Sequence, residues 1–181
     1  MILSKLKKTI ISIILLIFLI NNSLIYSQYS EYEIKAAMIG KFTLFIDWPE
    51  EVINNSKYFI INIIGVKEIL KPFKTIYKNK KIKNLPVKII YSNDINNEII
   101  NSHIIFVNKK FKNKIKSILT NLFNKSTLLI SDDDSLAKLG AHISFYLKDE
   151  NVRFKINYRT LKRTHLNVSY LLLNYGKVIE R

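Results

Sequence analysis

The sequence predicts an α/β protein: a three-layer sandwich with helices on both faces of a mixed, mostly parallel sheet that includes a C-terminal antiparallel hairpin. Two observations predict this class. Strand-like and helix-like segments alternate along the chain, as they do in parallel sheets whose strands are joined by helices. In addition, Phe59–Ile64 and Ile104–Val107 are almost continuously apolar. Such runs are typical of strands that helices bury from both sides.

Residues 1–27 have the composition of an export signal. Lys5, Lys7 and Lys8 precede an apolar run from Ile10 to Ile20. This run is shorter than the roughly 20 apolar residues that a membrane-spanning helix needs. We therefore expect residues 1–27 to be a cleaved Sec signal peptide, with an uncleaved membrane anchor as the alternative. Residues 28–181 are then one exported domain in the periplasm.

A helix is expected at the start of this domain. Ser30 and Glu33 match a capping box, in which each side chain accepts a backbone N–H of the other residue. Pro49 ends the segment because a proline disfavours helical geometry at the residue before it, Trp48. Helical spacing predicts an apolar face that packs on the core. The residues on that face are Ile34, Ala37, Met38, Phe42 and Phe45.

Strands and helices are expected to alternate through the middle of the chain. The strand-like runs are 58–66, 87–92, 103–108 and 126–131. Between them, 68–77 predicts a helix that Pro72 shortens or kinks. Residues 109–123 predict an amphipathic helix. Its apolar stripe consists of Ile115, Ile118, Leu119, Leu122 and Phe123.

The C-terminal part predicts a hairpin followed by one long helix. Residues 141–147 and 151–157 alternate apolar and polar side chains around the polar segment 148–151. This pattern is typical of an antiparallel hairpin with one solvent-exposed face. Residues 161–179 then predict a final amphipathic helix.

The chain is strongly basic, with 29 Lys and Arg residues against 14 Asp and Glu and a formal net charge of +15. The lysines are densest in residues 71–83 and 109–116. Such runs usually mark the solvated side of a helix. The alternative is contact with an acidic partner or peripheral contact with a membrane. We expect no nucleic-acid partner, because the chain has no nucleic-acid-binding motif.

No catalytic, metal or cofactor motif is present. The chain has no cysteine, and none of its histidines has a second ligand at short spacing. We expect His103 and His142 to be hydrogen-bonded structural side chains. Ser131–Ser135 lacks the glycine and the distal Glu of a calcium loop, so we expect it to cap a short helix. The four glycines form no phosphate-binding loop. The sequence therefore predicts no enzyme activity and no cofactor.

Four residues are candidates for partner contact. Trp48 is the single tryptophan. We expect it to close the core, with a role as an interface hot spot as the alternative. Arg153 alternates with its strand neighbours and should project from the opposite face of the hairpin. It is expected to pair with a carboxylate such as Asp132 or Asp149, or to contact a partner. Lys109 and Lys110 are the candidates in the second basic run.

The order of several short motifs resembles the YfiR-like family of small exported bacterial proteins. An Asp-Trp48-Pro49 segment follows the first helix, a later strand ends in Ser-Asp132, and Gly140-x-x-Ile-x-Phe145 precedes Val-Arg153-Phe-x-Ile-Asn157. Together these motifs span nearly the whole mature chain. We expect the matching residues mainly to define the fold. They are Lys35, Phe42, Trp48, Pro49, Asp132, Gly140, Phe145, Arg153, Phe154 and Asn157.

The resemblance implies a regulatory function. It implies a non-enzymatic protein that binds the periplasmic sensor region of an inner-membrane diguanylate cyclase and represses it. Cytoplasmic cyclic-di-GMP and surface attachment would then fall. We expect a homodimer. The alternative is a periplasmic accessory domain that captures a small solute at the carboxyl edge of the sheet.

Overall fold

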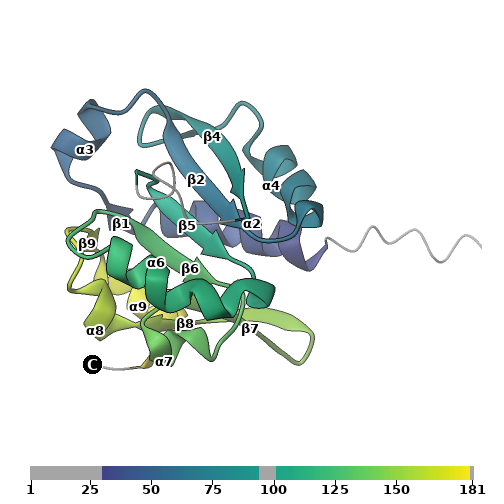
Figure 1. Ribbon diagram of the computed structural model, residues 1–181. Helices are drawn as coiled ribbons and strands as arrows, with labels where there is room; N and C mark the ends of the chain where they lie inside the picture. Colours follow the sequence, from purple (N-terminus) through teal and green to yellow (C-terminus); the bar gives the residue numbers. More distant parts are fainter. Residues whose placement is uncertain (1–29, 94–100, 180–181) are drawn as a thin grey trace, which may run out of the picture.

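The fold is an α/β sandwich in the computed structural model, which describes residues 30–93 and 101–179 (Figure 1). The export signal expected in residues 1–27 lies outside the described residues. The main strands are β2 (Phe59–Ile64), β3 (Lys81–Ile82), β4 (Leu85–Ser92), β5 (Ile104–Val107), β6 (Leu128–Ser131), β7 (Ile143–Lys148), β8 (Asn151–Asn157) and β10 (Lys177–Ile179). They form one sheet in the order β10-β8-β7-β6-β5-β2-β4-β3. A second, small sheet pairs β1 (Ile46–Asp47) with β9 (Asn167–Val168).

The centre of the main sheet is parallel, as the sequence predicts. Strands β4, β2, β5, β6 and β7 all run in one direction. The chain then reverses, and β8 pairs antiparallel with β7, so that Phe145 lies opposite Phe154. Asp149 and Glu150 in the turn have positive φ angles of 50° and 60°. Two such residues are typical of a type I′ hairpin turn, whose twist matches that of the strands.

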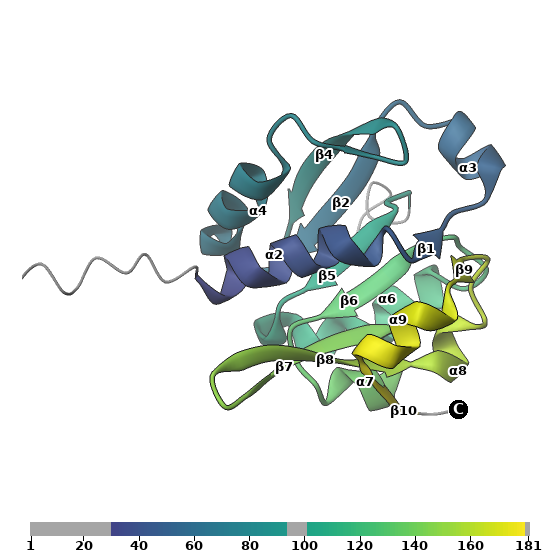
Figure 2. The same ribbon diagram turned by 180° about the vertical axis from the view of Figure 1, so that it is seen from behind.

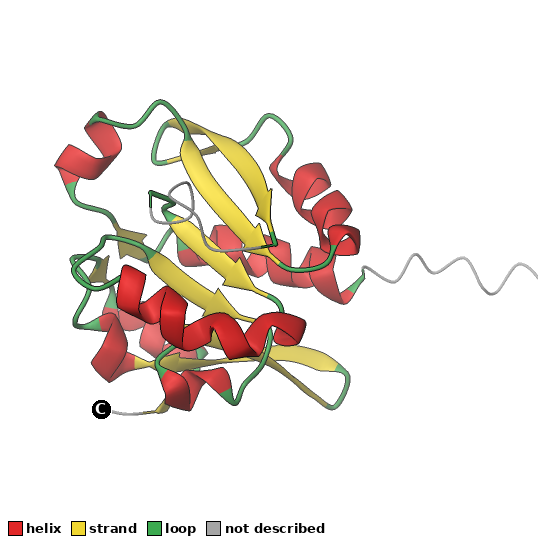
Figure 3. Ribbon diagram, in the orientation of Figure 1, coloured by secondary structure: helices red, strands yellow, loops and turns green. Residues whose placement is uncertain are grey.

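Helices cover both faces of the sheet (Figures 2 and 3). One face carries α2 (Glu31–Phe42), η2 (Lys67–Ile69), α4 (Leu70–Tyr77) and α9 (Tyr170–Tyr175). The other carries η3 (Lys109–Lys114), α6 (Ile115–Asn121) and α7 (Leu136–Leu139). Two short helices, α3 (Glu50–Asn54) and α8 (Tyr158–Leu161), lie in the connections. The three-layer arrangement agrees with the fold class that the sequence predicts.

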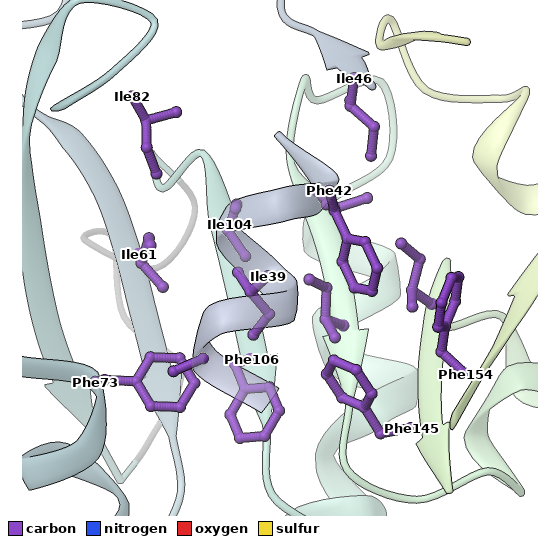
Figure 4. Packing of buried hydrophobic residues seen from close by; sticks show 14 of the residues in the cluster. Ile39, Phe42, Ile46, Ile61, Phe73, Ile82, Ile104, Phe106, Phe145 and Phe154 are labelled. Atoms are coloured by element: carbon purple, nitrogen blue, oxygen red, sulfur yellow. The ribbon is translucent and has the colours of Figure 1, made fainter. Parts of the chain in front are cut away.

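Each face of the sheet has its own hydrophobic core. The larger core lies under α2 and α4, where Ile39 and Phe42 pack among aromatic rings from the strands (Figure 4). The smaller core lies under α6 and α7 and contains Ile115, Ile118 and Leu122. Phe123, which the sequence assigns to the same stripe, is instead 76% exposed. The α-helix ends at Asn121, so Phe123 lies in the following turn.

The first helix is shorter than predicted, and it is rotated about its axis. The capping box of Ser30 and Glu33 is present, but α2 ends at Phe42 and the chain enters β1 before Trp48. Its buried face consists of Lys35, Ala36, Ile39 and Phe42. Ile34 and Ala37, which were expected inside, are exposed. The prediction was wrong because both sides of this helix carry apolar residues, and a buried ion pair of Lys35 selects the other side.

The single helix predicted for residues 161–179 is also wrong. The chain there forms the end of α8, then β9, α9 and β10. The Ser169 hydroxyl accepts the N–H of Leu171 and starts a new helix. Gly176 then lets the chain join the sheet beside β8. A Cβ atom at Gly176 would lie 2.4 Å from the Phe154 ring, so another residue does not fit without displacement.

Candidate functional site

Three aromatic residues of the sequence motifs, Phe42, Phe145 and Phe154, meet at the end of helix α2. The Phe42 ring lies 5.9 Å from that of Phe145 and 4.8 Å from that of Phe154, measured between centroids. These contacts join the start of the domain to the hairpin, more than a hundred residues later in the chain (Figure 4). Aromatic pairs at these separations stabilise a core beyond the effect of their buried area. These three aromatic residues thus form one packed unit of the fold.

A buried polar network lies at the N-terminal end of α2. The ammonium of Lys35 donates hydrogen bonds to the carboxylates of Asp132 and Glu31. The side chains of Lys35 and Asp132 are only 3% and 2% exposed. The Asn108 amide donates to the Asp132 carboxylate at 2.9 Å, and the Tyr32 hydroxyl donates to it at 3.2 Å. Asp132 follows β6 and Asn108 follows β5, so the network occupies the carboxyl edge of the parallel strands.

The groups of this network satisfy one another electrostatically. Burial raises the pKa of Asp132, and the hydrogen bonds and positive charge of Lys35 oppose that effect. Burial and the nearby Asp132 carboxylate raise the pKa of the Tyr32 hydroxyl to about 12. A carboxylate that already accepts bonds from three partners has little capacity for a substrate. The arrangement therefore holds α2 on the sheet and offers no obvious general base.

The neighbouring acidic residues have local structural roles. Partial burial of Asp133 opposes ionisation, but hydrogen bonds from Ser135 outweigh it and hold the pKa of Asp133 below its usual range. One of those bonds comes from the backbone N–H of Ser135, which directly precedes α7. Within the described residues, Ser135 forms no side-chain capping bond to α7. Asp134 pairs with Lys155 at 2.6 Å. Within the described ranges, no group of three or more His, Cys, Asp or Glu residues is placed to hold a metal ion.

Two buried histidines repeat one hydrogen-bonding arrangement. His103 Nδ1 accepts the backbone N–H of Ile60, and His142 Nδ1 accepts that of Leu129, each at 3.0 Å. Each histidine precedes its own strand and bonds to the strand beside it. Burial lowers the pKa of both imidazoles to about 4. They are therefore neutral at physiological pH, which agrees with the structural role expected from the sequence.

Gly140 and Asn157 connect α7 to the hairpin. Gly140 ends α7 in a left-handed conformation, with φ of 117°, which strains any residue that carries a Cβ atom. The Asn157 amide donates to the carbonyl of Ala137 at 2.8 Å, and its oxygen accepts the N–H of Thr160 at 3.0 Å. Both residues thus stabilise the backbone where α7 and the hairpin meet.

A family model described as YfiR/HmsC-like matches residues 32–177 of the chain. The chain belongs to the YfiR/HmsC-like family. The match includes Phe42, Phe145 and Phe154 and, apart from Glu31, the residues of the polar network, so the resemblance seen in the sequence is confirmed. The family comprises periplasmic regulators of diguanylate cyclase signalling, and its members are regulators rather than enzymes. No curated protein matches the chain.

The candidate contact residues of this YfiR/HmsC-like protein do not form one site. Trp48 is 5% exposed and packs edge-on against Phe59 at 4.9 Å, beside the start of β2. Lys109 and Lys110 are exposed beyond the opposite end of β5. Arg153 is exposed on β8, while Asp132 is paired with Lys35 instead. The partner role of all four residues stays a prediction, and the position of Trp48 favours its role in the core.

Sequence reasoning missed most of the polar network. Lys35 and Asp132 were recognised as motif residues, but their pairing was not. Asn108 carried a usable signal, since a polar residue directly after a buried strand lies at the carboxyl edge of the sheet. Glu31 lies four residues before Lys35, a spacing that favours an ion pair on a helix. Tyr32 carried no signal that separates it from other surface tyrosines.

Proposed function

We propose that this protein is an exported regulator that binds the periplasmic sensor region of an inner-membrane diguanylate cyclase and holds the cyclase inactive. The observation that carries this proposal is the YfiR/HmsC-like match over residues 32–177. Repression requires only that the protein bind the inactive conformation of the sensor more tightly than the active one. We also propose that residues 1–27 are removed on export and that the mature domain is a homodimer.

The architecture of the domain supports a binding role. Asp132, Lys35 and Tyr32 are buried and paired with one another rather than directed at a substrate. Within residues 30–93 and 101–179, no helix is long and apolar enough to cross a membrane. A partner in the membrane would then be reached through the surface of the domain, where the candidate contacts Lys109, Lys110 and Arg153 are exposed.

The alternative function, capture of a small solute, has less support. A solute-binding α/β domain normally keeps free polar groups at the carboxyl edge of its sheet. Here Asn108 and Asp132 at that edge bond to each other at 2.9 Å, and Lys35 from α2 covers them. The groups that would recognise a solute are already used within the fold.

Deletion of the gene tests the proposed function. Cyclic-di-GMP and surface attachment should both rise in the deletion strain. Expression of the full chain with its leader should reverse both changes, whereas a version without residues 1–27 should not, because it stays in the cytoplasm. Unchanged cyclic-di-GMP in a deletion strain that expresses its cyclases would contradict the proposal.

A further inference from the structure

An open apolar groove lies between α2 and α4, on the face of the sandwich shown in Figure 2. Its apolar lining consists of Ala37, Gly40 and Leu44 from α2 and the following turn, Ile76 and Tyr77 from α4, and Ile82 from β3. The rest of its lining is polar and consists of Thr43, Lys80, Lys81 and Lys83. The groove has a volume of about 470 Å³. Leu44 is 76% exposed at its border. A surface of this shape and composition accepts apolar side chains of another molecule.

The two helices that form the groove are fixed against each other. The Tyr77 hydroxyl donates a hydrogen bond of 2.7 Å to the carbonyl of Ala36. A Cβ atom at Gly40 would lie 3.3 Å from that hydroxyl oxygen, closer than ordinary contact allows. Glycine at position 40 thus permits the close approach of α4 to α2. The groove is therefore formed in the absence of a partner, which reduces the entropic cost of binding.

The exposed side of α2 carries apolar residues beside charged ones. The side chain of Ile34 is 38% exposed, and Ala37 is exposed between Ile34 and Leu44. A single exposed leucine is ordinary in a soluble protein. Ala37 and Leu44 also line the groove, and exposed apolar residues that gather at a groove are typical of an interaction site. Meanwhile Lys35 is directed inward to Asp132.

The border of the groove is basic. Lys80 and Lys81 line it, and Lys41 is exposed one helical turn after Ala37. Asp47 lies nearby, but it is paired with Lys83. A second copy of this chain would bring the same lysines against these, so charge disfavours self-association here. An occupant with carboxylates beside its apolar side chains complements both features.

The edge of the sheet next to the groove favours a helix over a strand as the occupant. Strand β3 is the edge strand, and it spans only Lys81 and Ile82. Short edge strands that carry lysine resist the addition of another strand. An amphipathic helix can instead place its apolar side chains in the groove and its acidic side chains on the lysines.

We propose that the α2–α4 groove binds an acidic amphipathic helix of a partner protein. This inference rests on the proposed function, because it identifies the surface through which the sensor region is held. It is distinct from the buried network of Lys35 and Asp132, which no partner reaches directly.

A binding measurement with defined probes tests the groove. The probes are a synthetic amphipathic helical peptide with leucine on one face and glutamate on the other, its lysine-for-glutamate counterpart, and phosphatidylglycerol vesicles. The purified protein should bind the acidic peptide only, and Leu44→Glu should weaken that binding by about tenfold or more. Leu139→Glu is the matched control, because Leu139 is 51% exposed on α7, away from the groove. Ala37→Glu serves as a second groove variant should Leu44→Glu unfold.

Three results would overturn the proposal. The first is no binding of the acidic peptide, and the second is equal binding of both peptides. The third is binding of vesicles alone that Leu44→Glu abolishes, which would assign the groove to a lipid surface. Unfolding curves that match the wild type for Leu44→Glu would establish that a loss of affinity arises at the groove.

A measurement in cells separates this inference from the proposed function. Leu44→Glu should raise cyclic-di-GMP to the level of the deletion strain, and Leu139→Glu should not. If deletion raises cyclic-di-GMP but Leu44→Glu still represses fully, the groove is not the binding surface, and the proposed repressor function stands. If deletion leaves cyclic-di-GMP unchanged but the protein binds the acidic peptide selectively, the repressor function is overturned. The proposal that the groove binds an acidic helix then stands.

Discussion

The ion pair of Lys35 and Asp132 is the residue-scale feature that positions the first helix. Both side chains are almost fully buried, and removal of Lys35 leaves the charge of Asp132 in the core without its cation. Breaking such a pair from one side costs about 3–5 kcal/mol, whereas replacing both partners with apolar residues costs much less. The main effect of the pair is therefore to determine which face of α2 packs on the sheet.

Replacement of Lys35 tests this role. Lys35→Met should lower the free energy of unfolding by about 3–5 kcal/mol, because Asp132 would remain buried without its cation. Lys83→Met is the matched control. Its partner Asp47 is 65% exposed, so the loss there should stay below about 1 kcal/mol. Urea unfolding of both variants gives the comparison, and equal losses would show that the buried pair has no special role.

Trp48 gives a second prediction at the same scale. The ring is buried against Phe59, and the indole Nε1 has no hydrogen-bond partner among residues 30–93 and 101–179. Trp48→Ala should therefore destabilise the domain by about 3–5 kcal/mol, as for other large aromatic side chains in cores. Trp48→Phe keeps an aromatic ring and removes the unpaired donor, so it should cost less. A Trp48→Ala variant that unfolds like the wild type but loses its partner would identify Trp48 as a contact residue instead.

At the scale of elements, the two histidines connect neighbouring parallel strands. His103 joins β5 to β2, and His142 joins β7 to β6, each through the neutral Nδ1 atom. Protonation of Nδ1 removes the acceptor and places a charge in the core. The strand starts are thus stable only while both imidazoles remain neutral.

The pH dependence of stability follows from these pKa values. The folded-state pKa of about 4 lies below the ordinary value of 6.5, so the unfolded chain binds more protons between the two. The contribution of each neutral histidine to the free energy of unfolding is complete above pH 6.5 and is lost as the pH falls toward 4. It is on the order of 3 kcal/mol for each histidine.

Asparagine variants provide the measurement. His103→Asn and His142→Asn keep an acceptor near the Nδ1 position but do not titrate. Their free energy of unfolding should change less between neutral and acidic pH than that of the wild type. Burial also raises the pKa of Asp132, which makes the free energy of unfolding change with pH in the opposite direction. This effect is the same in all three proteins and therefore cancels in the comparison. Parallel pH profiles for the wild type and both variants would contradict the assignment.

The elements differ in how well the sequence predicts them, for physical reasons. β2 and β5 were predictable because a strand buried on both sides must be apolar throughout. The face of α2 was not, because Ile34 and Ile39 are equally apolar and only the distant Asp132 distinguishes the two sides. The C-terminal segment was misjudged because short helices and strands rich in leucine resemble one long helix. The contact of Asn108 with Asp132 depends on strand order, which local patterns do not contain.

At the scale of the whole molecule, several features support the proposal that the domain acts by binding rather than by chemistry. The aromatic motif residues pack in the core, the carboxyl edge of the sheet is filled by paired side chains, and the apolar groove between α2 and α4 is open. The family match over residues 32–177 places these features in a group of periplasmic regulators. Specific repression of a cyclase is the proposal that links them.

Reconstitution of a membrane diguanylate cyclase from the same organism tests whether the domain represses the cyclase by binding it. The cyclase is placed in liposomes with its sensor region accessible to added protein, and the synthesis of cyclic-di-GMP from GTP is measured. Added wild-type protein should lower the rate to a saturable minimum, and Leu139→Glu should do the same. Leu44→Glu should require a higher concentration. The proposed repression would be contradicted if folded wild-type protein, at every concentration tested, left the rate of synthesis unchanged for each cyclase of the organism.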